Sequence, residues 1–92
     1  MEIEFDDEKR QRTLEARGLD FADAAIVFDG PEFTVLDDRE NYGEERFLTV
    51  GYLGDRLLAI VWTPRDAARR IISMRKCNDR EQRKYRRFVD RS

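Results

Sequence analysis

The sequence contains no histidine and only one cysteine, Cys77, among its 92 residues. The missing histidine removes the commonest metal ligand and the commonest general base, and serine–histidine and cysteine–histidine catalysis are therefore excluded. A lone cysteine excludes an internal disulfide, fits a reducing compartment and supplies too few ligands for a zinc site. We therefore expect no metal ion and no cofactor.

Long apolar runs are also missing. No run approaches the roughly 18 residues that a membrane-spanning helix needs. The acidic first stretch, MEIEFDDEKR, has no apolar centre of the kind found in secretory signals. Because the chain is short and has neither repeats nor a linker, we predict a single domain over residues 1–92. The lack of a secretory signal and of a membrane-spanning run predicts a location in the cytoplasm without a membrane partner.

Charge is abundant but unevenly distributed. Charged residues make up 41% of the chain, yet the formal net charge is only −2. Residues 1–45 hold 15 acidic and 5 basic side chains, a balance of −10, whereas residues 46–92 hold 5 acidic and 13 basic ones, a balance of +8. This asymmetry indicates an acidic face and a basic face, the second suited to nucleic acid or to an acidic partner. Alternatively, the two halves neutralise each other across the fold.

Hydrophobic spacing and capping residues predict the element order β-α-α-β-β-β-β-α. The expected strands are 3–5, 33–36, 47–53, 56–63 and 69–75, and the helices run from Asp6 or Asp7 to residue 15 or 16, from Asp20 to Phe28, and onward from Asn78. The run 57–62 is apolar on both faces, which is typical of a central strand. The predicted fold class is α+β, with a four- to five-stranded antiparallel sheet, two N-terminal helices and one C-terminal helix.

The stretch from Arg69 to Arg87, RRIISMRKCNDREQRKYRR, joins a short apolar run to a basic segment of helical character. Asn78 and Glu81 have the spacing of a capping box at the junction. Cations held on a strand and a helix bind phosphate, and RNA or DNA is the commonest large phosphate ligand. The alternative is a strand followed by a helix whose charges are simply solvated.

Strand alternation predicts which side chains of the apolar run share a face of the sheet. Ile71, Ser73 and Arg75 are expected on one face, and Ile72 and Met74 on the other. Arg75 is then expected on the same side of the sheet as Ile71.

Three segments occur in an order and spacing that point to a known family: GEERFLTVG at 43–51, RIISMRK at 70–76 and REQRKY at 80–85. Together with Phe5-Asp6, Gly18, Phe21 and Val27-Phe28-Asp29, they resemble the BrnT toxins, small ribonucleases of type II toxin–antitoxin systems with a RelE-like fold. The chain departs from the family pattern at four places: Ala16-Arg17 replaces a usual Lys-His pair, Thr13 an asparagine, Phe5 a tryptophan and Met74 an alanine.

The resemblance implies an endoribonuclease that arrests growth when it is free. It also implies inhibition by a BrnA-like ribbon-helix-helix antitoxin, in a heterotetramer of two toxins on an antitoxin dimer. In such a complex the antitoxin binds operator DNA, and the toxin reaches that DNA only through its partner.

Cleavage of RNA by its own 2′-hydroxyl needs a base, cations that stabilise the phosphorane, and an acid for the leaving 5′-oxygen. The planar fork of arginine suits the phosphate, and Arg75 and Arg46 are the candidates at strand ends. The candidates for proton transfer are Glu45, Lys76 and Tyr85, although Tyr85 can equally be an aromatic that packs the last helix onto the sheet. Further contacts to RNA are expected from Arg70, Arg80, Arg83 and Lys84. No metal ion is required by this chemistry.

Two other functions compete with the ribonuclease. The departures at Ala16 and Arg17 favour a catalytically weakened or inactive member that keeps the fold and acts as an RNA- or antitoxin-binding module. The basic last helix, taken alone, is compatible with a plain nucleic-acid-binding domain.

Overall fold

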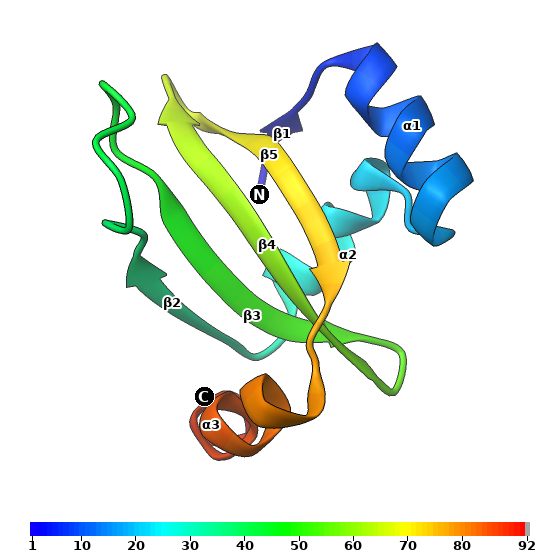
Figure 1. The fold of residues 1–92 in the computed structure, drawn as a ribbon, viewed down its shortest axis with the longest axis vertical. Coiled ribbons are helices and arrows are strands. Elements are labelled where there is room, and N and C mark those ends of the chain that lie inside the picture. The colour runs from blue at the N-terminus through cyan, green and yellow to red at the C-terminus, as the bar shows by residue number, and fades with distance from the viewer. Residues whose placement is uncertain (92) are drawn as a thin grey trace.

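The computed structural model describes residues 1–91 (Figure 1). Its elements follow the predicted order: β1 Ile3–Glu4, α1 Asp7–Arg17, the 3₁₀ turn η1 Phe21–Asp23, α2 Ala24–Asp29, β2 Glu32–Leu36, β3 Phe47–Leu53, β4 Arg56–Arg65, β5 Ala68–Lys76 and α3 Asp79–Asp90. The predicted α+β class is confirmed. Within the described residues, no helix is long and apolar enough to cross a membrane.

The first helix, α1, lies on the surface, and its ends are set by the residues that flank it. The Asp6 side chain accepts a hydrogen bond from the backbone N–H of Lys9 at 3.0 Å, as an N-cap does. Gly18 ends the helix with a φ of 68°, and its N–H donates to the Leu14 carbonyl. No side chain of α1 is buried, which agrees with its polar sequence.

The second predicted helix begins as η1 and continues as the six-residue α2. Asp20 is its cap, as predicted, because its side chain accepts a hydrogen bond from the N–H of Ala22. The spacing of Phe21, Ala24, Ala25 and Phe28 at i, i+3, i+4 and i+7 predicts the buried face, and the observed face differs from it by one residue. Val27 is fully buried whereas Ala25 is half-buried, because the 3₁₀ turn changes the angular spacing of the residues that follow it.

The five strands form one sheet in the order β1-β5-β4-β3-β2, with β4 at its centre as predicted. The four C-terminal strands pair antiparallel, but β1 pairs parallel with β5. The prediction of an entirely antiparallel sheet was therefore wrong at this edge. The chain leaves β1 through helices rather than through a hairpin, and such a crossover connection permits parallel pairing.

Helices cover both faces of the sheet. On one face, α2 and η1 bury a core with the inward side chains of β4 and β5. This core includes Phe21 and Val27 from the helical side and Ile60 and Met74 from the strands. On the other face, α3 packs on a smaller cluster that includes Val50, Ala59 and Val89. Figure 1 shows α3 apart from α1 and α2. Arg75 lies beside Ala59 in the sheet register, so its side chain belongs to the α3 face.

A β-bulge in β5 overturns the predicted alternation. Trp62 pairs with Ile71 and Val61 pairs with Ser73, which leaves Ile72 as an extra residue in the strand. Ile71 and Met74 consequently both lie in the core under α2. Because one additional residue reverses the alternation beyond it, Arg75 stands on the face opposite to Ile71 rather than beside it.

Candidate functional site

Arg75 is held by Glu81, which lies six residues later on the first turn of α3. Its Nη1 and Nη2 donate to the two carboxylate oxygens of Glu81 at 2.7 and 2.8 Å. Glu81 also accepts the backbone N–H of Asn78 at 3.0 Å and completes the predicted capping box. These bonds lower the pKa of Glu81 and raise that of Arg75, so the pair stays ionised. The fork uses two of the five N–H donors of Arg75 and leaves the other three outside this pair.

Arg75 and Glu81 line a pocket of about 350 Å³ between α3, the end of β2 and the loop that follows β2. Val35 and Leu48 supply apolar surface from the sheet, and Lys84 and Tyr85 line the pocket from α3. The pocket therefore combines cations, carboxylates, a phenol and apolar surface.

The loop after β2 adds a second arginine–carboxylate pair to this pocket. Arg39 donates from Nε and Nη2 to Asp37 at 2.7 and 2.9 Å. The Asp37 side chain is only 3% exposed, whereas that of Arg39 is 69% exposed. The hydrogen bonds from Arg39 lower the pKa of Asp37. A buried carboxylate thus holds an exposed guanidinium at the mouth of the pocket.

Arg46 and Glu45 lie in an adjoining hollow that shares Leu36, Asp37 and Asp38 with the Arg75 pocket. Arg46 stacks over the ring of Tyr42 at 4.1 Å from its centroid and contacts Glu44 at 3.2 Å. Its backbone carbonyl accepts the N–H of Asp37 at 2.7 Å. These two candidates therefore lie next to the Arg75 pocket but not among the residues that line it.

The remaining candidates are spread over the molecule. Lys76 follows Arg75 in the strand and points to the opposite face of the sheet. Arg70 pairs with Glu4 at 3.2 Å near the other end of β5. Arg80 and Arg83 are exposed on α3, whereas Lys84, on the same helix, lines the Arg75 pocket.

Tyr85 packs α3 onto the sheet, which was the alternative to a role in proton transfer, and it also lines the Arg75 pocket. Its ring lies 5.9 Å from that of Phe33, and it packs against the cluster beneath α3. Trp62 is buried, and its Nε1 donates to Thr49 at 2.8 Å, which makes it a core residue.

The positions where the resemblance implies a Lys-His pair lie at the end of α1, beside β5. Ala16 and Arg17 line a separate hollow with Thr13, Ile72 and Ser73. Arg17 donates to the backbone carbonyl of Met74 at 2.9 Å and so satisfies an acceptor at an edge of β5 that β1 does not reach. Arg17 therefore makes a structural hydrogen bond to Met74, the residue that precedes Arg75.

Sequence reasoning missed four charged residues of the Arg75 pocket: Asp37, Asp38, Arg39 and Glu81. Glu81 was recognised only as a helix cap, although its position six residues after Arg75 at a strand-to-helix junction was a usable signal. Asp37 and Arg39 belong to a polar loop without periodicity, and no local pattern places such a loop beside α3. No group of three histidine, cysteine or carboxylate side chains within residues 1–91 gathers as metal ligands would.

The arrangement suits a phosphate ester. Arginine donors and a lysine converge on one pocket, and the apolar and aromatic walls can face a sugar or a base. Its class is thus that of a small α+β protein with an arginine-anchored pocket at a strand-to-helix junction, in which cations stand beside the carboxylates that hold them.

Comparison with known families agrees with this description. The model of the BrnT family, described as the ribonuclease toxin, BrnT, of type II toxin–antitoxin systems, matches residues 5–81, and the chain belongs to that family. The match ends at Glu81, in the first turn of α3. A type II toxin has a protein antitoxin as its partner, as the family description implies. No curated protein matches the chain.

Proposed function

We propose that the chain is a metal-independent endoribonuclease whose reaction centre is the Arg75 pocket. The observation that carries this proposal is the Arg75 guanidinium, fixed by two bonds to Glu81 beside Lys84 and Tyr85. In this reaction the ribose 2′-oxygen attacks phosphorus, and the bond from phosphorus to the 5′-oxygen breaks. The negative charge that develops on the phosphorane is stabilised by the donors of Arg75 that lie outside the ion pair.

Proton transfer is assigned to Tyr85. Among Glu45, Lys76 and Tyr85, it is the phenol that lines the same pocket as Arg75, whereas Lys76 faces the other side of the sheet and Glu45 lies in the adjoining hollow. As the 2′-oxygen attacks, the 2′-hydroxyl proton passes to solvent water and a 2′,3′-cyclic phosphate forms. The phenol of Tyr85 gives its proton to the departing 5′-oxygen, which produces a 5′-hydroxyl, and the phenolate regains a proton from water. Arg46 and Arg39 supply positive charge at the border of the pocket.

The proposal includes the regulation that the family implies. Free toxin cleaves cellular RNA and arrests growth, and a BrnA-like antitoxin of the ribbon-helix-helix class neutralises it in a complex of two toxins on an antitoxin dimer. The family description supports a protein antitoxin. The toxin reaches operator DNA only through that partner.

A cleavage assay tests the enzyme. Purified chain is incubated with end-labelled RNA in excess EDTA, beside Arg75→Ala and beside Arg56→Ala, an exposed arginine at the start of β4. We expect the wild type and Arg56→Ala to cleave in EDTA, and Arg75→Ala to lose at least about 100-fold in rate, the effect of removing one transition-state donor.

Two results contradict the proposal. Loss of cleavage in EDTA with recovery on addition of a divalent cation excludes metal independence. Cleavage by Arg75→Ala at the wild-type rate removes the Arg75 pocket from the reaction.

One observation favours the alternative of a binding module. Arg17 is committed to the Met74 carbonyl, and Ala16 has no ionisable group, so the end of α1 offers no base where the family usually has Lys-His. Intact RNA in all three reactions, with RNA affinity retained, supports this second function.

A further inference from the structure

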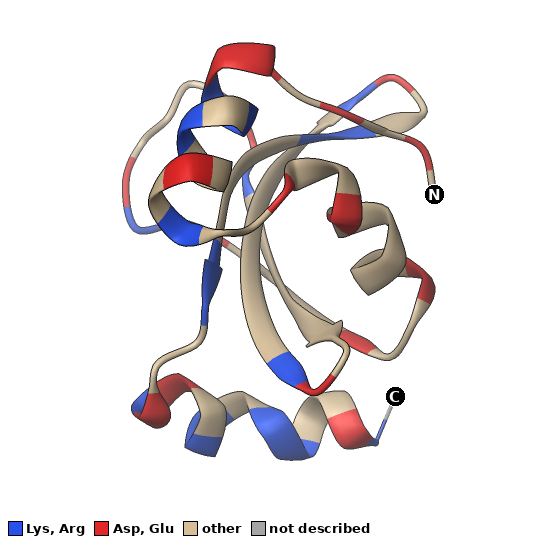
Figure 2. Ribbon diagram, turned by 90° about the vertical axis from the view of Figure 1, so that its right-hand side faces the viewer, with Lys and Arg blue, Asp and Glu red and all other residues tan. Residues whose placement is uncertain are grey.

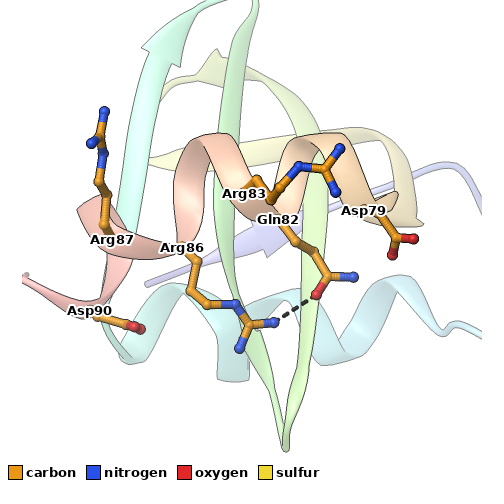
Figure 3. A pocket seen from close by; sticks show the side chains of 6 residues that line it. All are labelled: Asp79, Gln82, Arg83, Arg86, Arg87 and Asp90. Carbon is orange, nitrogen blue, oxygen red and sulfur yellow. Dashed lines mark hydrogen bonds between the residues drawn. The ribbon is translucent and has the colours of Figure 1, made fainter.

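The outer face of α3 carries five cations in one continuous row, which we call the α3 basic stripe: Arg80, Arg83, Lys84, Arg87 and Arg91. Arg80, Lys84, Arg87 and Arg91 are three or four residues apart and Arg83 adjoins Lys84, so the row follows one side of the helix for about three turns. All five are exposed. Figure 3 shows Arg83 and Arg87 on the same side of the helix, whereas Arg86 turns toward Gln82, to which it donates at 2.6 Å.

Most other arginines of the protein have a carboxylate partner, whereas the residues of the stripe have none within residues 1–91. Within residues 1–91, each of the following pairs with an acidic side chain: Arg10, Arg39, Arg46, Arg65, Arg69, Arg70 and Arg75. None of the five stripe residues forms such a pair in this part of the chain. Two of the three acidic residues of α3 have other partners, since Glu81 binds Arg75 and Asp90 accepts a bond from Tyr52 at 2.8 Å. The third, Asp79, stands four residues before Arg83, but no ion pair joins the two within residues 1–91.

Like charges three and four residues apart repel each other and destabilise a helix. A protein of net charge −2 has enough carboxylates to neutralise such a row, yet the fold leaves the row open. The blue segments of α3 in Figure 2 show how basic residues gather on it. A polyanion that neutralises several cations at once would remove this repulsion.

The position of the stripe indicates which polyanion. Lys84 belongs both to the stripe and to the lining of the Arg75 pocket, so the stripe reaches the pocket. Arg83 and Arg87 also line a hollow of about 470 Å³ on the surface of α3, together with Arg86, Gln82 and the carboxylates of Asp79 and Asp90. One turn of a helix advances about 5.4 Å, so the row offers a cation at each turn, with Lys84 at the pocket and Arg87 and Arg91 beyond it. A nucleic acid strand that enters the pocket can therefore continue along α3.

We propose that the α3 basic stripe binds the phosphate backbone of the RNA next to the scissile bond and thereby extends the substrate site by several nucleotides. This inference rests on the proposed ribonuclease function and states how the enzyme holds its substrate. It concerns residues beyond Glu81, outside the part of the chain that matches the family, for all of the stripe except Arg80. The contacts are ionic and independent of base identity.

The test measures binding separately from cleavage. Fluorescence anisotropy is recorded with a labelled 2′-O-methyl oligoribonucleotide, which cannot be cleaved through its 2′-oxygen, over a range of salt concentrations. The variant Arg83→Gln/Arg87→Gln is compared with Arg12→Gln/Arg56→Gln, which removes two exposed arginines outside α3. The charge-preserving Arg83→Lys/Arg87→Lys serves as the rescue, and circular dichroism confirms that all variants are folded.

Loss of two phosphate contacts lowers the slope of log Kd against log salt concentration by about 1.4, which is about a 25-fold loss of affinity at roughly 0.1 M salt relative to 1 M. We expect this loss in Arg83→Gln/Arg87→Gln and near wild-type affinity in the lysine variant and in the control. Equal losses in the control variant overturn the proposal, because they indicate general charge attraction. Unchanged affinity in Arg83→Gln/Arg87→Gln also overturns it, and favours an acidic protein surface as the partner of the stripe.

The outcome separates this inference from the proposed function. A stripe that binds 2′-O-methyl RNA in a protein that cleaves no RNA supports the inference and contradicts the enzyme. Cleavage that depends on Arg75 but is indifferent to Arg83 and Arg87 in both KM and affinity supports the enzyme and contradicts the stripe.

Discussion

Glu81 takes part in two local structures at the same time. Its Oε1 accepts the N–H of Asn78 at 3.0 Å and Nη1 of Arg75 at 2.7 Å, while its Oε2 accepts Nη2 of Arg75. Because one carboxylate both starts α3 and orients Arg75, the position of the guanidinium is coupled to the start of the helix. Glu81 is therefore a positioning residue in the proposed reaction.

The substitution Glu81→Gln tests this role. The amide oxygen can still accept the cap hydrogen bond, but the amide nitrogen cannot accept from the second arm of the Arg75 fork. We expect kcat to fall about tenfold, because the guanidinium loses its fixed orientation. We expect KM to fall as well, because a carboxylate no longer competes with the RNA phosphate for Arg75. Steady-state cleavage kinetics measure both constants.

The control for this experiment is Glu8→Gln, which neutralises an exposed acid in the first turn of α1. Its kinetics should equal those of the wild type. An increase in KM with unchanged kcat in Glu81→Gln contradicts the assigned role, because it indicates a contact to bound RNA rather than orientation of Arg75.

The same pair gives the stability a dependence on acid pH. Arg75 lowers the pKa of Glu81, so the unfolded chain binds a proton at Glu81 more readily than the folded protein does. The stabilisation is therefore present above the ordinary pKa of a glutamate and is lost as pH falls through the lower pKa of the folded state. The wild type should lose more stability than Glu81→Gln when the pH is lowered to about 3.

At the scale of elements, α2 lies so close to β3 that the strand needs a glycine. A Cβ placed on Gly51 would lie 2.7 Å from Cγ1 of Val27 and 3.2 Å from the carbonyl oxygen of Pro31. Val27 is fully buried and cannot move aside freely. The glycine thus permits the close packing of helix on strand that forms the main core.

We expect Gly51→Ala to lower the free energy of unfolding by about 1–3 kcal/mol, the usual cost of overpacking a core. Gly30→Ala is the matched control, because its Cβ would meet nothing closer than 3.8 Å and its φ is negative. Urea unfolding followed by circular dichroism measures both. A control that loses as much stability as Gly51→Ala would assign the effect to the alanine itself rather than to contact with Val27.

At the scale of the whole molecule, Arg69 connects opposite parts of the fold. Its guanidinium lies 4.2 Å from the ring centroid of Trp62 and 4.5 Å from that of Phe28, and it contacts Glu32 at 3.3 Å. It thus reaches from β5 over β4 to α2 and to the start of β2, with only 17% of its side chain exposed. The acidic first half and the basic second half neutralise each other here, and also where Arg65 and Arg70 meet Glu4.

We expect Arg69→Ala to reduce stability by about 2–3 kcal/mol, because the half-buried Glu32 carboxylate loses an ion pair and two aromatic rings lose their cation. Arg65→Ala should change it by at most about 0.5 kcal/mol, since Arg65 is half exposed and lies 3.8 Å from Glu4. Urea unfolding compares the two. Equal effects would mean that the position of Arg69 between Trp62 and Phe28 contributes nothing.

The sequence by itself determined the elements and most of their boundaries. The caps at Asp6, Asp20 and Asn78 act over three residues or fewer, and the apolar run of β4 can only be a central strand. These signals are local, and hydrogen bonding within a turn or burial of one stretch is enough to produce them. The order of the elements and the family could therefore be predicted.

Only the tertiary structure decided the composition of the site. The bulge at Ile72 depends on pairing with β4, and it moved Arg75 to the α3 face. The loop arginine Arg39 reached the pocket because its partner Asp37 is buried, with its backbone N–H bonded to Arg46 directly before the start of β3. Contacts of this kind join residues that are distant in sequence, and their geometry follows from how strands and helices pack rather than from any local spacing.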